Sequence, residues 1–264
     1  IYTFEAKIAT SWQSGRAFLL GDAAHVTPPF AGQGMNAGLR DAHNLSWKLF
    51  LVCKGQSGPS ILQSYETERR GPCWAMIQLA VAMGDIVMPR DHSDITFRNS
   101  LVKWMDRFPA AREFITQMKF KPPPRYTDGI FVNFDDQEFT GSLVGQMLPQ
   151  IPVKYLNGTH VKLDKILGHG FTLIVQDEGT LEFLHQIKHQ LWPELACKIV
   201  AIGERLIAAP DNVIRLQPKS DTTVKQLRSH RDQIILIRPD RYVAASFDQH
   251  NYKQVIPKLS SLLS

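Results

Sequence analysis

Near its start, the chain has a short apolar run, followed by apolar residues at helical spacing. The run, residues 17–20, is too short for a helix and too uniform for a half-exposed strand, so it predicts a buried strand that stops at Gly21. The helical positions are Leu39, Ala42, Leu45, Leu49 and Val52. They predict a helix of about five turns that begins near Gly34 and ends before Gly55.

The segment between strand and helix is predicted to be a shaped loop. Residues 27–34 read TPPFAGQG, in which two prolines fix φ and two glycines permit unusual backbone angles. Asp22 follows the predicted strand, at the end of a sheet where ligands dock, and its carboxylate can accept hydrogen bonds from sugar or ribityl hydroxyls. The free N–H groups of the helix start suit phosphate, or a ligand atom that becomes anionic, such as those of a reduced flavin.

The pattern that follows predicts further helices. Residues 2–9 alternate between apolar and polar side chains, which predicts an opening strand. A helix is predicted over residues 60–87, with a bend near Pro72 because a proline removes one helical hydrogen bond. A third, amphipathic segment covers residues 94–118, and the Lys-Pro-Pro-Pro run at 121–124 ends it.

From about residue 153, short apolar runs alternate with helical segments. The predicted strands are residues 171–175, 197–202 and 212–216 and a hairpin of 233–237 with 241–247; the predicted helices are 180–191, 222–230 and 252–263. A βαβ unit followed by a helix, a hairpin and a helix resembles the thioredoxin order. The turn from Asp177 to Thr180 contains no thiol, so we interpret this domain as a structural or assembly module without disulfide chemistry.

Composition places the chain among soluble globular proteins of one or two domains, since 44% of its 264 residues are apolar and 21% are charged. The net charge of +5 is not gathered into a run, which argues against nucleic acid and suits anionic ligands such as NADH or an aryl carboxylate. Three scattered cysteines favour a reduced, cytoplasmic compartment. No apolar stretch reaches the roughly 18 residues of a membrane span. The start at Ile1, without Met, indicates a fragment.

Two consecutive motifs resemble a known family. GD-A-A-H-x-x-P-P-x-x-G-x-G-x-N at residues 21–36, followed by D-A-x-N-L-x-W-K-L at 41–49, is similar to the second flavin-binding motif of single-component FAD-dependent aromatic hydroxylases. Three later stretches resemble 3-(3-hydroxyphenyl)propionate hydroxylases and lie at residues 65–70, 118–122 and 238–245. The resemblance spans the whole chain.

The resemblance assigns flavin contacts to residues of the loop. It implies that Asp22 anchors the ribityl chain, although a turn or cap role is the alternative. Pro29 would lie against the flavin ring rather than simply stiffen the loop. The start of the helix would place backbone N–H groups near the flavin pyrimidine, where negative charge gathers on reduction. The implied cofactor-binding residues are Gly21, Asp22, Pro29, Gly32, Gly34, Met35 and Asn36.

By this resemblance, the fold is α/β. Residues 1–125 would be the C-terminal part of an FAD-binding monooxygenase domain with a helical layer, 126–152 a linker, and 153–264 a thioredoxin-like α/β domain lacking the CxxC. The whole enzyme would take hydride from NADH or NADPH, trap O₂ as a flavin C4a-hydroperoxide and hydroxylate a phenolic aryl acid ortho to its hydroxyl. The fragment alone would be inactive.

Two other interpretations stay open at this point. The chain could be a non-catalytic thioredoxin-like assembly module that carries a remnant FAD motif. Another flavoprotein family with the same GD motif, such as an epoxidase, is disfavoured by the C-terminal domain. A homodimer is an open option, because closed twofold dimers are the commonest assemblies of soluble enzymes.

The other candidate residues have less specific patterns. His25 is interpreted as a packed histidine that shapes the loop rather than a catalytic base, and no catalytic residue is assigned. His185 and His189 stand four apart but lack a third ligand, so we interpret them as a solvated helix face and predict no metal. The acidic pairs at residues 135–136 and 177–178 are not expected to form an acid–base dyad.

Overall fold

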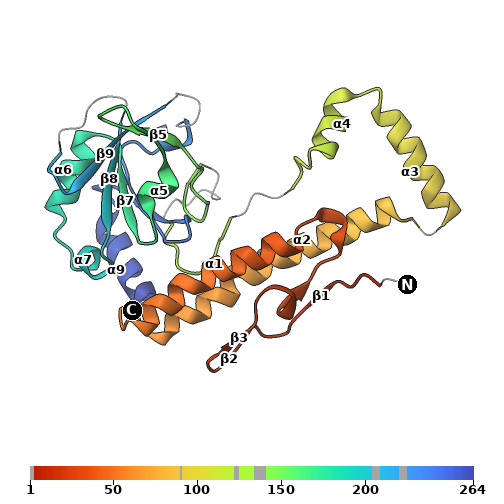
Figure 1. The fold of residues 1–264 in the computed structure, drawn as a ribbon, viewed down its shortest axis with the longest axis horizontal. Coiled ribbons are helices and arrows are strands. Elements are labelled where there is room, and N and C mark those ends of the chain that lie inside the picture. The colour runs from red at the N-terminus through yellow and green to blue at the C-terminus, as the bar shows by residue number, and fades with distance from the viewer. Residues whose placement is uncertain (1–2, 90, 122–124, 134–140, 204–208, 220–224) are drawn as a thin grey trace. The chain divides into compact units, whose positions relative to one another are not determined.

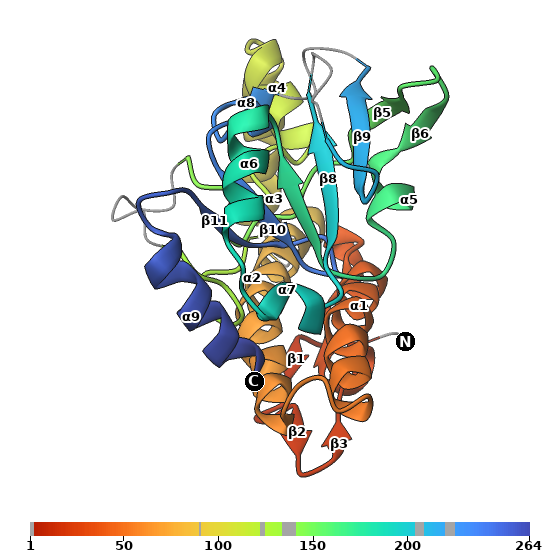
Figure 2. The same ribbon diagram turned by 90° about the vertical axis from the view of Figure 1, so that its left-hand side faces the viewer.

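The computed structural model describes residues 3–89, 91–121, 125–133, 141–203, 209–219 and 225–264. They fall into two compact units, the first built from residues 1–42 and 66–124 and the second from residues 43–65 and 125–264. Two long helices, α1 (Gly34–Cys53) and α2 (Ser64–Val87), lie side by side (Figures 1 and 2). The first part of α1 belongs to the first unit and its last part to the second.

The first unit begins with four very short strands. β1 (Lys7–Ile8) pairs antiparallel with β4 (His25–Val26), and β2 (Gln13–Ser14) pairs antiparallel with β3 (Ala17–Phe18). The predicted strand over residues 2–9 is thus confirmed only at Lys7–Ile8. Two single-turn 3₁₀ helices flank β4, η1 (Gly21–Ala23) before it and η2 (Pro29–Ala31) after it.

The prediction of a buried strand over residues 17–20 is wrong. β3 is two residues long, and Leu19 and Leu20 are 38% and 39% exposed. An apolar run is buried as a strand only where a sheet has neighbours and cover on both faces. Among the described residues, β3 pairs only with β2, so the run has no such cover.

Helix α1 confirms the predicted helix, and its end shows why it stops where it does. Gly55 has φ of 68°, a left-handed conformation that glycine adopts without strain. The Gly55 N–H donates to Val52 O and the Gln56 N–H donates to Leu51 O, at 3.0 and 2.9 Å. This pair of bonds is the Schellman motif, which satisfies carbonyl groups at a helix end.

The helical part of the chain differs from prediction in two places. The first turn of the predicted helix from residue 60 is a 3₁₀ helix, η3 (Pro59–Gln63), and α2 then continues through Pro72 without interruption. The predicted segment 94–118 is two helices, α3 (His92–Met105) and α4 (Pro109–Thr116). Pro109 causes the division, because proline cannot continue a helix but is favoured at its first position.

None of the described helices is by itself long and apolar enough to cross a membrane. The pair Pro59–Val87 and His92–Met105, which is bent by 96°, reaches that length and composition only when both members are taken together.

The second unit contains a seven-stranded mixed sheet in the order β11-β10-β7-β8-β9-β5-β6. Strands β7, β8 and β9 are parallel, and the other pairings are antiparallel. The strands are β5 (Pro152–Tyr155), β6 (His160–Lys162), β7 (Thr172–Val175), β8 (Lys198–Ile202), β9 (Val213–Pro218), β10 (Ile234–Ile237) and β11 (Val243–Phe247).

Most of the predicted elements of this unit are present. The strands predicted from residue 171 onward correspond to β7 to β11, and the helix over residues 252–263 is confirmed as α9 (Tyr252–Leu263). The helix predicted over 180–191 is instead α6 (Glu178–Gln186), with a separate short α7 (Leu191–Glu194) after it. The predicted helix 222–230 is present as α8 (Lys225–Arg228), and residues 222–224 lie outside the described residues.

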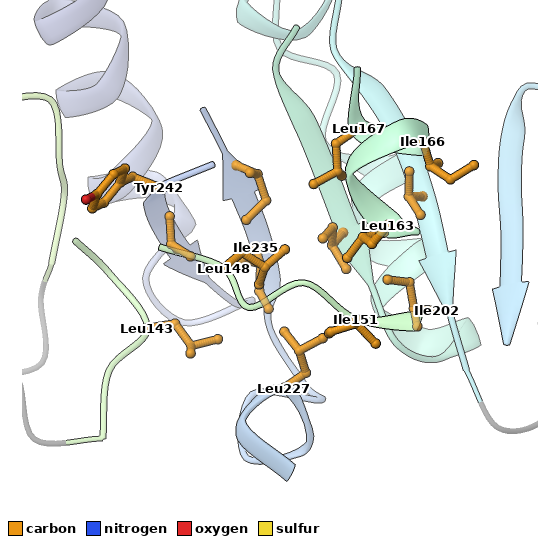
Figure 3. Close-up of a cluster of buried hydrophobic side chains, with 14 of the residues drawn as sticks. Leu143, Leu148, Ile151, Leu163, Ile166, Leu167, Ile202, Leu227, Ile235 and Tyr242 are labelled. Carbon is orange, nitrogen blue, oxygen red and sulfur yellow. The ribbon is translucent and has the colours of Figure 1, made fainter. Parts of the chain in front are cut away.

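The core of the second unit covers both faces of this sheet. Ile174, Val200 and Ile235 are neighbours in register across three strands, and they share one face with the short helix α5 (Leu163–Leu167) (Figure 3). Successive residues of a strand point to opposite faces, so Leu173 and Leu236 point to the other one. Helices α6 and α9 bring their own buried leucines and isoleucines to the sheet.

The segment expected to be a linker, residues 126–152, packs into the second unit where it is described. Tyr126, Ile130 and Leu148 are at most 5% exposed, and the Tyr126 ring stacks on Tyr242 at 4.2 Å. Isolated bridges join Val132 to Ala245 and Met147 to Tyr242. Residues that precede β5 in the chain therefore pack against β11 and the residue just before it.

Candidate functional site

The residues predicted to contact a flavin lie around the loop that precedes α1, in the first unit. The side chains of Asp22, Pro29, Met35 and Asn36 are exposed, and Met35 has 77% of its surface accessible. Asp22 makes no hydrogen bond or ion pair with any residue that the structure describes. These side chains therefore leave the loop surface open to a ligand.

Two of the predicted glycines set the backbone of this loop. Gly21 and Gly32 have φ of 58° and 59°, in the left-handed region where other residues are strained. A third glycine, Gly38, was not predicted as a site residue. A Cβ at Gly38 would meet the Gly21 Cα at 3.2 Å, so the helix passes unusually close to the turn.

The start of α1 offers backbone donors at the loop. The first helical hydrogen bond runs from the Ala37 N–H to Gln33 O at 2.9 Å. The N–H groups of Gly34, Met35 and Asn36 precede it and cannot be satisfied within the helix. Such donors, together with the helix dipole, stabilise negative charge.

A buried ion network underlies the loop, with Asp41 of α1 at its centre. Asp41 is 0% exposed, and its Oδ2 contacts His25 Nε2 at 2.6 Å and accepts a hydrogen bond from the Gly21 N–H at 3.1 Å. Its Oδ1 accepts from Arg69 Nε of α2 at 2.8 Å. Asp41 therefore connects the turn, the loop and both helices.

The protonation states in this network follow from burial and charge. Burial acts to raise the pKa of Asp41, but the hydrogen bond with His25 and the charge of Arg69 outweigh it, so the pKa is below the ordinary 3.8. Burial raises the pKa of the neighbouring Cys73 thiol to about 12. Asp41 is thus a carboxylate and Cys73 a neutral thiol near neutral pH.

The same residues include a set with metal-ligand chemistry. Atoms of His25, Asp41 and Cys73 lie within 4.8 Å of one another. The guanidinium of Arg69 already occupies this space, because its Nε contacts Asp41 and its Nη2 lies 3.2 Å from Cys73 Sγ. A cation at this position and a thiol with a pKa of about 12 favour an ion pair over a bound metal.

The interpretation of His25 as a packed histidine is confirmed. It is 2% exposed, and its ring lies 5.3 Å from that of Trp12. The roles of Asp41, Arg69 and Cys73 were not predicted, although the motifs at residues 41–49 and 65–70 contain two of them. Their separation along the chain, up to 48 residues for His25 and Cys73, gave no signal that they meet.

A lysine from a distant motif also contacts the loop. Lys121 Nζ donates to Gln33 Oε1 at 2.7 Å. Burial first, and then the charge of Arg40, lowers the pKa of Lys121. The loop side of the first unit therefore carries two cationic side chains close together.

A second buried network lies within the second unit. Arg238 is 0% exposed, and its guanidinium binds Asp240 while its Cζ lies 5.0 Å from the Trp47 ring and 4.4 Å from the Phe131 ring. Asn44 Nδ2 donates to Asp240 at 3.4 Å, and Lys48 Nζ donates to Asn44 Oδ1 at 2.8 Å. The motifs at residues 41–49 and 238–245 thus meet in space.

The remaining candidates have structural roles where they are described. Asp177 caps α6 by accepting from the Thr180 N–H at 2.8 Å. The prediction that His185 and His189 share a helix face is wrong, because α6 ends at Gln186. His189 Nδ1 instead accepts from the Leu191 N–H. The pair at 135–136 lies outside the described residues.

Comparison with known proteins matches both parts of the chain. Residues 1–80 match the FAD binding domain family, and residues 145–262 match the HcaD C-terminal domain. The 3-(3-hydroxy-phenyl)propionate/3-hydroxycinnamic acid hydroxylase 2 of Burkholderia vietnamiensis is 34% identical over 94% of this chain and 46% of its own length. A hydroxylase of the same kind from Escherichia coli O157:H7 is 32% identical over 100% of this chain and 48% of its own.

The chain is similar to these aromatic hydroxylases over nearly its whole length. The resemblance in its motifs is confirmed, and the matched FAD binding domain identifies FAD as the cofactor class, as predicted. The chain spans about half the length of the curated relatives it matches.

Solved structures of hydroxylases share the fold. Aklavinone-11 hydroxylase, solved with FAD and aklavinone, has a TM-score of 0.68 at 22% identity over 99% of this chain and 46% of its own. The flavin-dependent monooxygenase PieE, solved with FAD and substrate, has a TM-score of 0.73 at 19% identity over 99% of this chain and 50% of its own.

Proposed function

We propose that this chain supplies the ribityl- and pyrimidine-contacting part of an FAD site in an aromatic monooxygenase. The observation that carries the proposal is the loop before α1, where the first N–H groups of the helix lack a partner within the helix and the Asp22 side chain is exposed. When bound, the flavin supplies the redox chemistry and the activation of O₂. The chain's own residues bind the cofactor and orient it.

Each predicted residue has a distinct task in this proposal. Asp22 accepts hydrogen bonds from ribityl hydroxyls, since an ionised carboxylate is only an acceptor. The N–H groups of Gly34, Met35 and Asn36 donate toward the pyrimidine, where the helix dipole favours negative charge. Pro29, which is exposed and has no N–H, lies against the ring.

Three further residues support the site from beneath. Gly21 and Gly32 provide the left-handed turns of the loop, and neither tolerates a side chain without backbone strain. Asp41 binds the Gly21 N–H and fixes the turn that presents Asp22.

For the whole protein, we propose ortho-hydroxylation of a phenolic aryl acid such as 3-(3-hydroxyphenyl)propionate, with O₂ and with NADH or NADPH as co-substrate. The names of the relatives from Burkholderia vietnamiensis and Escherichia coli support this substrate class. A cytoplasmic location and a homodimer belong to the same proposal. The catalytic residues are not assigned from this chain.

The domain organisation is also a proposal. We propose residues 1–125 as the C-terminal part of the flavin domain, 126–152 as the connection and 153–264 as a thioredoxin-like domain. The order β11-β10-β7-β8, with β7 and β8 parallel, supports the thioredoxin-like interpretation. Burial raises the pKa of Cys197 to about 12, which supports a domain without thiol chemistry.

The replacement of Asp22 by alanine tests the proposed FAD site. In a protein of the relatives' full length that contains this chain, losing a charged acceptor should cost about 1.5–3 kcal/mol, or roughly ten- to hundredfold in FAD affinity. Titration of the apoprotein with FAD measures it, with Asp85→Ala, another exposed aspartate of the first unit, as the matched control. An unchanged dissociation constant would make Asp22 a turn residue. If the unmodified full-length protein binds no FAD, the result would support the alternative interpretation of the chain as a non-catalytic assembly module.

A further inference from the structure

A pocket of about 460 Å³ opens in the second unit, and none of its described lining residues belongs to the flavin loop. Its volume lies in the range of small-molecule sites, roughly 300–1,000 Å³. The last part of α1, the segment before β7 and the segment after α7 surround it. Its apolar lining is Trp47, Phe50, Leu51, Phe171, Leu195 and Pro239.

The aromatic walls of this pocket are held in place. Trp47 is 6% exposed and meets Phe171 edge to face, with ring centroids 5.6 Å apart. Arg238 lies over the Trp47 ring at 5.0 Å and is itself fixed by Asp240. These two rings form a fixed apolar wall of the pocket, and a flat aromatic ligand can pack against such a wall.

The polar atoms of the pocket favour a ligand that accepts hydrogen bonds. The Nε1–H of Trp47 is buried and has no partner among the described residues, an arrangement that folded proteins usually avoid. His43, Ser46 and His169 also line the pocket and can donate. None of the described lining residues is Asp or Glu, so no lining carboxylate would pair with a cation.

We propose that this pocket binds a planar aromatic molecule that carries an oxygen acceptor, an aryl carboxylate being the class that fits it. The aromatic ring would lie in the pocket against the Trp47–Phe171 pair, and the carboxylate would accept from the Trp47 Nε1–H and the pocket's imidazole or hydroxyl groups. The site shares no described residue with the proposed flavin site.

The test is calorimetric titration of the full chain and its variants with 2-naphthoate. Trp47→Phe keeps an aromatic ring but removes the donor, and it should weaken binding about three- to tenfold. Trp192→Phe is the matched control, because the Trp192 Nε1–H is also buried without a described partner in the same unit but does not line the pocket. Its affinity should equal that of the unmodified chain.

Two further variants fill the pocket. A Cβ at Gly170 meets no atom within 4 Å, so Gly170→Leu should place its side chain in the open space and abolish binding. Ser46→Leu, at an exposed position of α1, is the second filling variant if Gly170→Leu does not fold. Circular dichroism establishes which variants are folded.

Matched ligands distinguish the class of occupant. 2-Naphthylmethylammonium has the same ring with a cation, and cyclohexanecarboxylate has the anion without the aromatic ring; both should bind at least about tenfold more weakly than 2-naphthoate. The proposal is overturned if 2-naphthoate shows no saturable binding, if the ammonium ligand binds as tightly, or if Trp192→Phe weakens binding as much as Trp47→Phe.

Discussion

Replacement of Asp41 by alanine tests whether the buried ion network stabilises the first unit. The substitution would leave the Arg69 guanidinium, which is 2% exposed, without its carboxylate, and the Gly21 N–H without its acceptor. Breaking a buried ion pair by removing one partner costs about 3–5 kcal/mol. A neutral donor that loses its acceptor, here the Gly21 N–H, costs about 1–3 kcal/mol. Because water can enter the space left by the side chain, we expect a loss of about 4 kcal/mol in the free energy of unfolding.

Urea unfolding followed by tryptophan fluorescence measures this loss, and one of the five tryptophans, Trp12, has its ring 5.3 Å from that of His25. The control is Asp85→Ala, in which an exposed aspartate of the same unit is removed, with an expected change within about 0.5 kcal/mol. A loss below about 1 kcal/mol in Asp41→Ala, or equal losses in the two variants, would refute the conclusion that Asp41 holds the loop and the two helices together.

The pH dependence of the same network gives a second readout. The pKa of Asp41 is lowered in the folded state, below the ordinary 3.8, so the carboxylate contributes stability above pH 3.8 that is lost as pH falls through the lower folded value. Asp41→Asn should flatten this acid limb when unfolding free energies are compared from about pH 6 to about pH 2. An acid limb as steep as that of the unmodified chain would contradict the ionised state of Asp41.

Two more predictions concern buried chemistry and backbone strain. A thiol reagent at about pH 8 should modify the exposed Cys53 first, since burial raises the pKa of Cys73 and Cys197 to about 12; Cys53→Ser should remove the fast phase, and a fast phase that remains would contradict this. Gly145→Ala should cost about 3 kcal/mol or more, because Gly145 has φ of 75° and a Cβ there would collide with Tyr126 O. Gly170→Ala, with open space, is its control in thermal unfolding, and equal stability of the two would refute the clash.

Part of the candidate site could be predicted from local sequence patterns and part could not. The shaped loop and the helix behind it follow from two prolines, two glycines and helical spacing, all of which act over a few residues. The ion network beneath the loop could not be predicted in this way. Arg69 and Asp41 are 28 residues apart, and only the packing of α1 against α2 brings their charges to 2.8 Å. The flavin contacts of the loop stay predictions, and the titration of Asp22→Ala tests them.

The amino-acid sequence alone determined the elements whose signal is local and strong. Two kinds of local signal gave correct predictions. Apolar residues at helical spacing predicted helices α1 and α9, and near-continuous apolar runs predicted strands β7 and β10. The tertiary structure decided what depends on a partner elsewhere in the chain. Residues 17–20 have the composition of a buried strand, yet Leu19 and Leu20 are exposed, because burial requires neighbours that a short apolar run cannot specify. Arg238 is the opposite case, a cation that is fully buried because Asp240, Trp47 and Phe131 surround it.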